Sequence, residues 1–308
     1  MNSRIRHTLF PVLAAAIWGT AFVAQSVSTE YVRPFTFNML RSVIAFLVLL
    51  VILGAFRLMR RKAAKTPGPR KTNRKALLLG GLCCGTALTA ASYLQQAGLG
   101  DTSAGKAGFI TALYIVLVPV FGLFLHKRVS LPVWAAVAAA VVGLYLLCVR
   151  ENFTISPGDG YVFACALIFA VHILLIDRFA GEVDGIALSC VQFAVMAVLS
   201  GIGALLFETI EWAAVLRCLG PILYVGIFSS GVAYTLQILA QKDADPTVVS
   251  LLLSLESVFS VLAGAVILHE RLSGREYLGC IFMFIAVVLA QLPSGKLSEL
   301  FHRNRSHR

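Results

Sequence analysis

The sequence predicts an all-α integral membrane protein of ten transmembrane helices. Three observations carry this prediction: the composition, the apolar segments and the distribution of basic residues. Of the 308 residues, 58% are hydrophobic and only 13% are charged, and the mean hydropathy is +0.85. A soluble domain has about a quarter of its residues charged. Water therefore cannot be the solvent for most of this surface, and the lipid bilayer must be.

The apolar residues fall into segments close to the length of about 20 residues that a spanning helix needs. The first five cover residues 8–28, 34–56, 76–98, 104–125 and 131–149. The second five cover residues 159–177, 185–207, 218–241, 246–268 and 275–292. The first segment follows two arginines, as the apolar part of a signal peptide does. We expect no cleavage, because this segment also fills the first position of an internal repeat.

The basic residues set the orientation, because cytoplasmic loops carry an excess of Lys and Arg. With ten spans and both termini in the cytoplasm, 19 of the 26 Lys and Arg residues lie on the cytoplasmic side and five on the other. An odd number of spans would move the basic C-terminal tail, 293–308, to the wrong side. The cytoplasmic side then also holds the basic loop 57–75.

An internal repeat appears when the chain is shifted by 143 residues, which places His126-Lys127-Arg128-Val129-Ser130 on His269-Glu270-Arg271-Leu272-Ser273. The two units are 1–149 and 150–292. Each contains five spans, an odd number, so the second unit is inverted in the membrane relative to the first. Inverted repeats are the architecture of secondary transporters, whose substrate sites lie near the midplane between the repeats.

Two charged residues lie well inside the predicted spans and suggest function, since a charge in the bilayer costs several kcal/mol (roughly 3 on insertion scales). Glu256 is near the middle of its span. It is either a group for a substrate amine or a transported proton, or a structural acid bonded to a neighbouring helix. Arg41 follows Asn38 on one helical face. It binds a substrate carboxylate, pairs with Glu256, or extends to the outer interface.

Polar stripes at helical spacing occur in the third and eighth segments, which are equivalent in the two units. One consists of Thr86, Thr89, Tyr93 and Gln96, and the other of Ser230, Tyr234, Gln237 and Gln241. Both must face inward, either to line a polar cavity or to bond between helices. His172 is either a proton-coupling group, like Glu256, or a packing residue. The full set of candidates for substrate binding is Trp18, Gln25, Asn38, Arg41, Thr89, Tyr93, Gln96, Tyr114, His172, Tyr234, Gln237 and Glu256.

Enzyme motifs are incomplete in this chain. His269-Glu270 lacks the second histidine of a zinc protease helix. Gly98-Leu99-Gly100-Asp101 resembles an intramembrane aspartyl protease motif, but no second aspartate lies within a span. No phosphate-binding Walker loop occurs. We therefore expect no catalytic residue, no metal and no cofactor. The expected partners are a small-molecule substrate and the bilayer, with no nucleic acid, and a homodimer is left open.

Several segments resemble the drug/metabolite transporter superfamily, specifically its ten-helix EamA-type carriers. Ala14-Ala15-Ala16-Ile17-Trp18-Gly19 is similar to the family's opening A-x-x-W-G, and Arg41 to its Arg-led second helix. Leu255-Glu256-Ser257-Val258-Phe259 and Leu268-His269-Glu270-Arg271-Leu272 resemble its L-E-P-V-F and L-G-E-R-L signatures. The chain departs from the pattern at Ser257, at His269 and, in the first unit, at Tyr114 and Lys127.

The resemblance implies two five-helix bundles around a central cavity, alternating access, and location in the plasma membrane or bacterial inner membrane. It implies a secondary transporter of a small organic metabolite, such as an amino acid or amine, or of a drug. Segments eight and nine hold no Lys or Arg within their apolar core, which disfavours a phosphorylated substrate. Two alternatives remain: a non-transport scaffold or lipid-handling protein, and, less favoured, an intramembrane enzyme.

Overall fold

The chain is all helical in the computed structural model, which describes residues 3–62, 73–102, 104–127, 129–148, 156–242, 244–267 and 273–290. The first unit contains α1 (Ser3–Ser28), α2 (Pro34–Lys62), α3 (Arg74–Gly98), α4 (Ala104–Ala112), α5 (Tyr114–Phe124) and α6 (Leu131–Cys148). The second contains α7 (Pro157–Ala180), α8 (Gly185–Phe207), α9 (Trp212–Arg217), α10 (Leu219–Tyr224), η1 (Val225–Ala233), α11 (Tyr234–Gln241), α12 (Pro246–Leu253), α13 (Glu256–Ile267) and α14 (Gly274–Ala290). The basic tail 293–308, most of loop 57–75 and the 268–272 motif lie outside the described residues.

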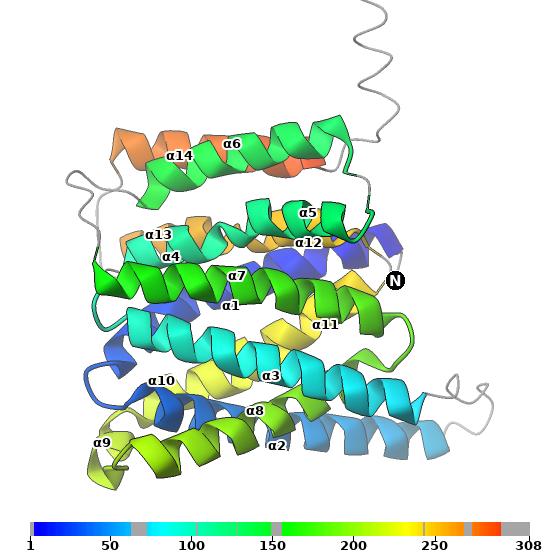
Figure 1. The fold of residues 1–308 in the computed structure, drawn as a ribbon, viewed down its shortest axis with the longest axis vertical. Helices are drawn as coiled ribbons and strands as arrows, with labels where there is room; N and C mark the ends of the chain where they lie inside the picture. Colours follow the sequence, from blue (N-terminus) through cyan, green and yellow to red (C-terminus); the bar gives the residue numbers. More distant parts are fainter. Residues whose placement is uncertain are drawn as a thin grey trace, which may run out of the picture.

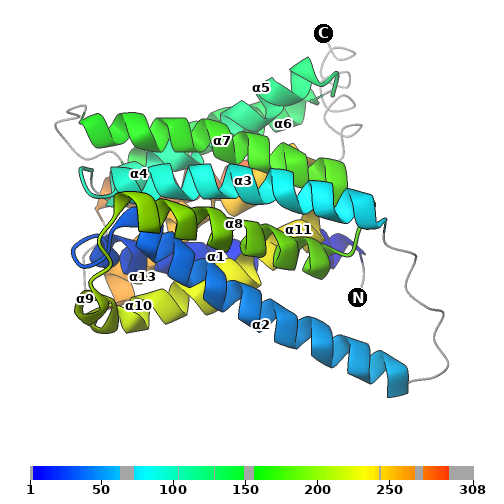
Figure 2. The same ribbon diagram turned by 60° about the horizontal axis from the view of Figure 1, so that its bottom comes forward.

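Eight of the ten predicted segments contain helical stretches long and apolar enough to cross a membrane. The other two, α6 and α14, are helices of 18 and 17 residues. The long helices lie side by side with roughly parallel axes in both ribbon views (Figure 1 and Figure 2). The prediction of an all-helical membrane protein is confirmed.

Three of the predicted segments are not single helices. The fourth divides at Leu113, and the ninth divides at Ser254 and Leu255. At both breaks the backbone tightens to bonds three residues apart, such as Val116 N–H to Leu113 O (2.9 Å) and Ser257 N–H to Ser254 O (3.2 Å). The eighth segment runs through α10, the nine-residue π-helix η1 and α11. A hydropathy profile depends only on the length and polarity of a segment, so it does not detect such breaks.

The helix contacts recur between the two units. The pair α6 and α14 lies at one end of the bundle, and the pair α2 and α8 at the other (Figure 1). Between these ends, α3 packs on α7 and α8, and correspondingly η1 packs on α1 and α2. Likewise, α1 packs on α12 and α13, as α7 packs on α4 and α5. These contacts between the units therefore have counterparts in which each helix is replaced by the equivalent helix of the other unit.

Small residues bring α3 against α8. A Cβ atom on Gly81 would lie 2.2 Å from Val191 Cγ1, and one on Gly85 would lie 2.7 Å from the backbone oxygen of Gln192. Lipid tails are as apolar as side chains, so close backbone approach supplies much of the attraction between membrane helices. These two glycines therefore set the distance between α3 and α8.

Two ion pairs connect the units at the two ends of α7. Lys106 pairs with Asp159, which also accepts a hydrogen bond from Thr102 (2.7 Å), and Lys127 pairs with Asp177. His126, with a positive φ of 59°, forms the turn that directs Lys127 back to α7. Lys127, one of the positions at which the chain departs from the resembled pattern, therefore has an acidic partner on α7.

We predict that Gly85→Ala destabilises the protein by about 1–3 kcal/mol, because the added methyl group overpacks a rigid backbone contact. The matched control is Gly160→Ala on α7, where an added Cβ meets nothing within 4 Å. Thermal unfolding of the detergent-solubilised protein measures both. Equal melting temperatures for the two variants would contradict this account of the contact between α3 and α8.

Candidate functional site

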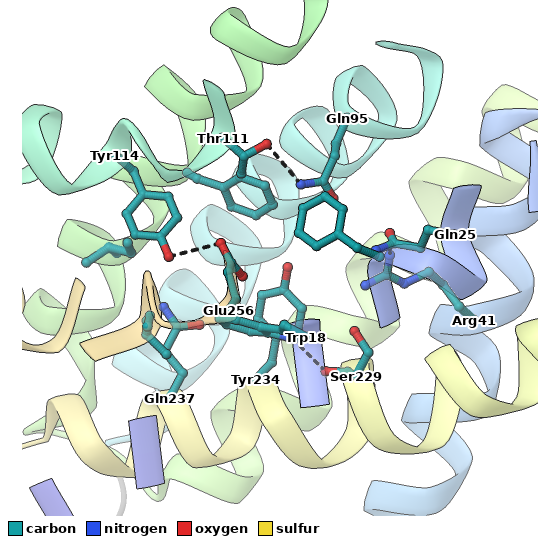
Figure 3. A pocket seen from close by; sticks show the side chains of 14 residues that line it. Trp18, Gln25, Arg41, Gln95, Thr111, Tyr114, Ser229, Tyr234, Gln237 and Glu256 are labelled. Atoms are coloured by element: carbon teal, nitrogen blue, oxygen red, sulfur yellow. Dashed lines mark hydrogen bonds between the residues drawn. The ribbon is translucent and has the colours of Figure 1, made fainter. Parts of the chain in front are cut away.

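A cavity lies at the centre of the bundle, where helices of both units meet (Figure 3). The space between its atoms totals about 470 Å³, of which about 40 Å³ is open to the centre of a water molecule. That room suits roughly three water molecules, so an organic solute would need the surrounding helices to move apart. The lining residues are Trp18, Phe22, Gln25, Arg41, Gln95, Thr111, Tyr114, Phe169, Ile173, Ser229, Tyr234, Gln237, Leu253 and Glu256.

Ten of the lining residues form five pairs of equivalent positions in the two units. The pairs on the third, fourth, eighth and ninth segments are 142 residues apart: Gln95 with Gln237, Thr111 with Leu253, and Tyr114 with Glu256. Those on the first and sixth segments are 151 residues apart: Trp18 with Phe169, and Phe22 with Ile173. The two spacings differ because the first unit has more residues between its first and third segments; α2 alone has 29 residues and α8 has 23. The cavity is therefore lined by matched positions of both units.

Glu256 is the first residue of α13, and the break before this helix turns its side chain into the cavity. The residue is 4% exposed. Its Oε1 accepts a hydrogen bond from the hydroxyl of Tyr114 (3.2 Å), the first residue of α5. The two helix breaks therefore place the matched positions 114 and 256 in contact. Among the described side chains, Tyr114 is the one hydrogen-bond partner of this carboxyl group.

Arg41 lies on the opposite side of the cavity from Glu256 (Figure 3). Its Nε donates to Ser230 Oγ (2.9 Å) and one terminal nitrogen donates to Gln25 Oε1 (3.0 Å). The residue is 2% exposed. The alternative in which Arg41 extends to the outer interface is therefore wrong, because three helices enclose the guanidinium group. No ion pair joins it to Glu256 within the described part of the chain.

Aromatic side chains separate the acid from the guanidinium group. The rings of Trp18 and Tyr234 have centroids 4.7 Å apart. The indole N–H of Trp18 donates to the backbone oxygen of Ser229 (3.3 Å) in η1. The same oxygen accepts the backbone N–H of Tyr234, five residues later. The π-helix thus orients both rings, as expected for a helical distortion near a functional site.

Seven of the twelve candidate residues line this cavity: Trp18, Gln25, Arg41, Tyr114, Tyr234, Gln237 and Glu256. The other five lie elsewhere, namely Asn38, Thr89, Tyr93, Gln96 and His172. Thr89 Oγ1 donates to Gly85 O on its own helix (2.7 Å). Tyr93 stacks on Phe35, with ring centroids 4.1 Å apart, beside a second hollow near Glu208.

The remaining candidates make interhelical contacts or are buried. Gln96 donates to the backbone oxygen of Gln25 (3.1 Å). Asn38 is 0% exposed, and its side-chain amide has no partner among the described residues. His172 is also 0% exposed and contacts Gln192 (3.3 Å). Its ring lies 6.0 Å from that of Tyr234, so it is one residue removed from the cavity.

Sequence reasoning missed three polar lining residues, Gln95, Thr111 and Ser229, and four apolar ones, Phe22, Phe169, Ile173 and Leu253. The stripe on the third segment selected Gln96, whereas its neighbour Gln95 faces the cavity. A 142-residue shift, applied to the third and eighth segments, would have matched Gln95 to Gln237. The 143-residue shift came from the loop motif and is off by one residue here.

The comparisons with known proteins agree with this architecture. The EamA-like transporter family matches twice, over residues 7–149 and 156–292. The chain therefore belongs to the EamA-like transporter family, a group of membrane transporters and not enzymes.

Individual relatives cover nearly the whole chain. An uncharacterized transporter of Archaeoglobus fulgidus is 29% identical, over 94% of this chain and 87% of its own length. The uncharacterized transporter YwfM of Bacillus subtilis is 24% identical, over 96% and 98%. A solved crystal structure with 24% identity has a TM-score of 0.76 and covers 94% of this chain and 98% of its own, which supports the fold.

We predict that the contact between Tyr114 and Glu256 stabilises the protein. Tyr114→Phe and Glu256→Leu should each lower the melting temperature, and the double variant should lose less than the sum, with a coupling of about 1 kcal/mol. Thermal unfolding of the unmodified protein, the two single variants and the double variant in one detergent completes the double-mutant cycle. Additive effects would mean that the hydrogen bond contributes no coupling energy.

Proposed function

We propose that the protein is a secondary transporter that moves a small organic metabolite or drug through the central cavity by alternating access. The two units, 1–149 and 150–292, would be inverted repeats that rearrange around the cavity. The observation that carries this proposal is a cavity lined by matched positions of both units, with an acid and a guanidinium group inside it. Substrate sites of inverted-repeat transporters lie at that place.

The positive charges support an orientation with both termini in the cytoplasm and ten spans in a plasma membrane, or in the inner membrane of a bacterium. The described basic residues fit it, since Lys127 and Arg178 would share the cytoplasmic side with loop 57–75. A homodimer stays an open expectation.

An amino acid, an amine or a similar compound suits the lining best. Glu256 offers a carboxyl group to an amine, Arg41 offers a guanidinium group to a carboxylate, and the aromatic rings between them offer apolar walls. Arg41 is the one Lys or Arg in the lining. It already donates to two neighbours, and this argues against a phosphorylated substrate.

Coupling to protons would use Glu256, because a carboxyl group enclosed in the membrane can bind either a proton or the substrate amine. His172 is the second candidate, since it contacts the ring of Tyr234 and not the cavity itself. Exchange of proton for amine at one carboxyl group would couple the two fluxes without a further ion.

The test is uptake into liposomes that contain the purified protein, with an imposed pH gradient. Amino acids, amines, nucleobases, sugars and sugar phosphates are offered in turn. We expect one class to accumulate, Glu256→Gln to reduce uptake at least tenfold, and His172→Asn to reduce it less. Glu182→Gln is the matched control, because that acid is exposed and pairs with Arg178 on its own helix turn (2.5 Å).

The proposed transport function would be contradicted if no class of compound were taken up and if Glu256→Gln strongly destabilised the protein. Glu256 would then be a structural acid, and a scaffold or lipid-handling protein would be favoured.

A further inference from the structure

The two equivalent glutamines of the cavity are in different states. Both are buried, Gln95 at 6% and Gln237 at 2% exposed. The amide of Gln95 donates to Thr111 Oγ1 (3.4 Å). The position equivalent to Thr111 in the second unit is Leu253, which has no acceptor. The amide N–H of Gln237 therefore has no acceptor at that position. A separate observation concerns its Oε1, which is buried without a hydrogen bond from any residue that the structure describes.

An unpartnered amide oxygen in a membrane protein's interior requires an explanation. Leaving a buried acceptor unsatisfied costs about 1–3 kcal/mol, and native proteins seldom do so. Gln237 and Glu256 lie on the same side of the cavity, away from Arg41 and Gln25 (Figure 3). Tyr114 bonds to Oε1 of Glu256, and no described residue donates to Oε2. Two oxygen acceptors without donors thus face one part of the cavity.

The chemistry of this part of the cavity identifies the group it would bind. Two acceptors require a ligand group with several N–H donors, and a carboxylate favours a positive charge. A primary ammonium group has three donors and a positive charge. The rings of Trp18 and Tyr234 beside it favour a cation near their faces. On the other side of the cavity, Arg41 donates two of its five N–H groups to Gln25 and Ser230, and it offers donors where an ammonium group needs acceptors.

We propose that Gln237 and Glu256 together bind the ammonium group of an organic amine, and that Gln237 is the residue that selects for it. This inference rests on the proposed function, because it assigns the substrate class to the same cavity. It places the specificity of the protein in the second unit, where the Gln237 amide lacks the contact that holds Gln95 to Thr111 and its Oε1 has no donor.

The test compares two probes with the same ring and opposite charges, tryptamine and indole-3-propionate, by thermal shift of the purified full-length protein. We expect tryptamine to raise the melting temperature and indole-3-propionate to leave it unchanged. Gln237→Leu should weaken tryptamine binding at least tenfold, since a hydrogen bond to a charged group contributes about 1.5–3 kcal/mol. Gln237→Glu retains an acceptor at this position and should bind tryptamine at least as tightly as the unmodified protein.

The matched control is Gln241→Leu, the same substitution one helical turn away. Gln241 donates to the backbone oxygen of Ile173 (2.9 Å) and does not line the cavity. This variant should lose stability but keep its affinity for tryptamine. If Gln237→Leu does not fold, Gln237→Glu and Gln241→Leu still separate the recognition of an amine from stability, because only the first changes the group facing the ligand.

Stabilisation by indole-3-propionate alone would overturn the inference and assign the ligand to Arg41. Lack of stabilisation by tryptamine and by the aliphatic amine putrescine would also overturn it. Liposome uptake, measured separately, distinguishes this failure from failure of the proposed function. A protein that transports sugars but binds no amine is a transporter with another substrate. A protein that binds tryptamine but transports none of the compounds has the proposed amine site, and in that case only the proposed transport function fails.

Discussion

The cost of placing polar groups in hydrocarbon governs the arrangement of this protein. A membrane helix satisfies its own backbone, but a buried guanidinium or carboxyl group needs partners from other helices. Arg41 finds them on α1 and η1, and Glu256 finds one on α5. These contacts fix which helices surround the centre of the bundle. Apolar packing between α6 and α14 and between α2 and α8 then encloses the remainder.

Hydropathy predicted the helical segments, because spanning length is a one-dimensional property. The helix breaks before Tyr114 and Glu256 were not predicted, since they arise from local backbone bonds that apolar residues can adopt. The π-helix was missed for the same reason. Its nine residues include Gly226 and Gly231 but carry no polarity signal.

The candidate site was predicted best where a residue is costly in the membrane and least well where neighbouring positions compete. Glu256 and Arg41 were evident because few charged residues lie within spans. Gln96 was predicted to line the cavity and Gln95 was not. Adjacent positions on a helix are separated by a rotation of about 100°, so only one of the two faces the cavity. Helical spacing alone does not determine which side of a polar stripe faces inward. The pairing of equivalent positions in the two units does determine it, because Gln95 pairs with Gln237.

The lining departs from exact twofold equivalence in a way that has an energetic consequence. With identical units, a conformation open to one side of the membrane and the same conformation open to the other would have equal free energy. Tyr114 against Glu256, and Thr111 against Leu253, make the two halves of the cavity lining unequal. If access alternates as proposed, the empty protein would therefore prefer one side, and a ligand that changes the interactions of Glu256 would change that preference.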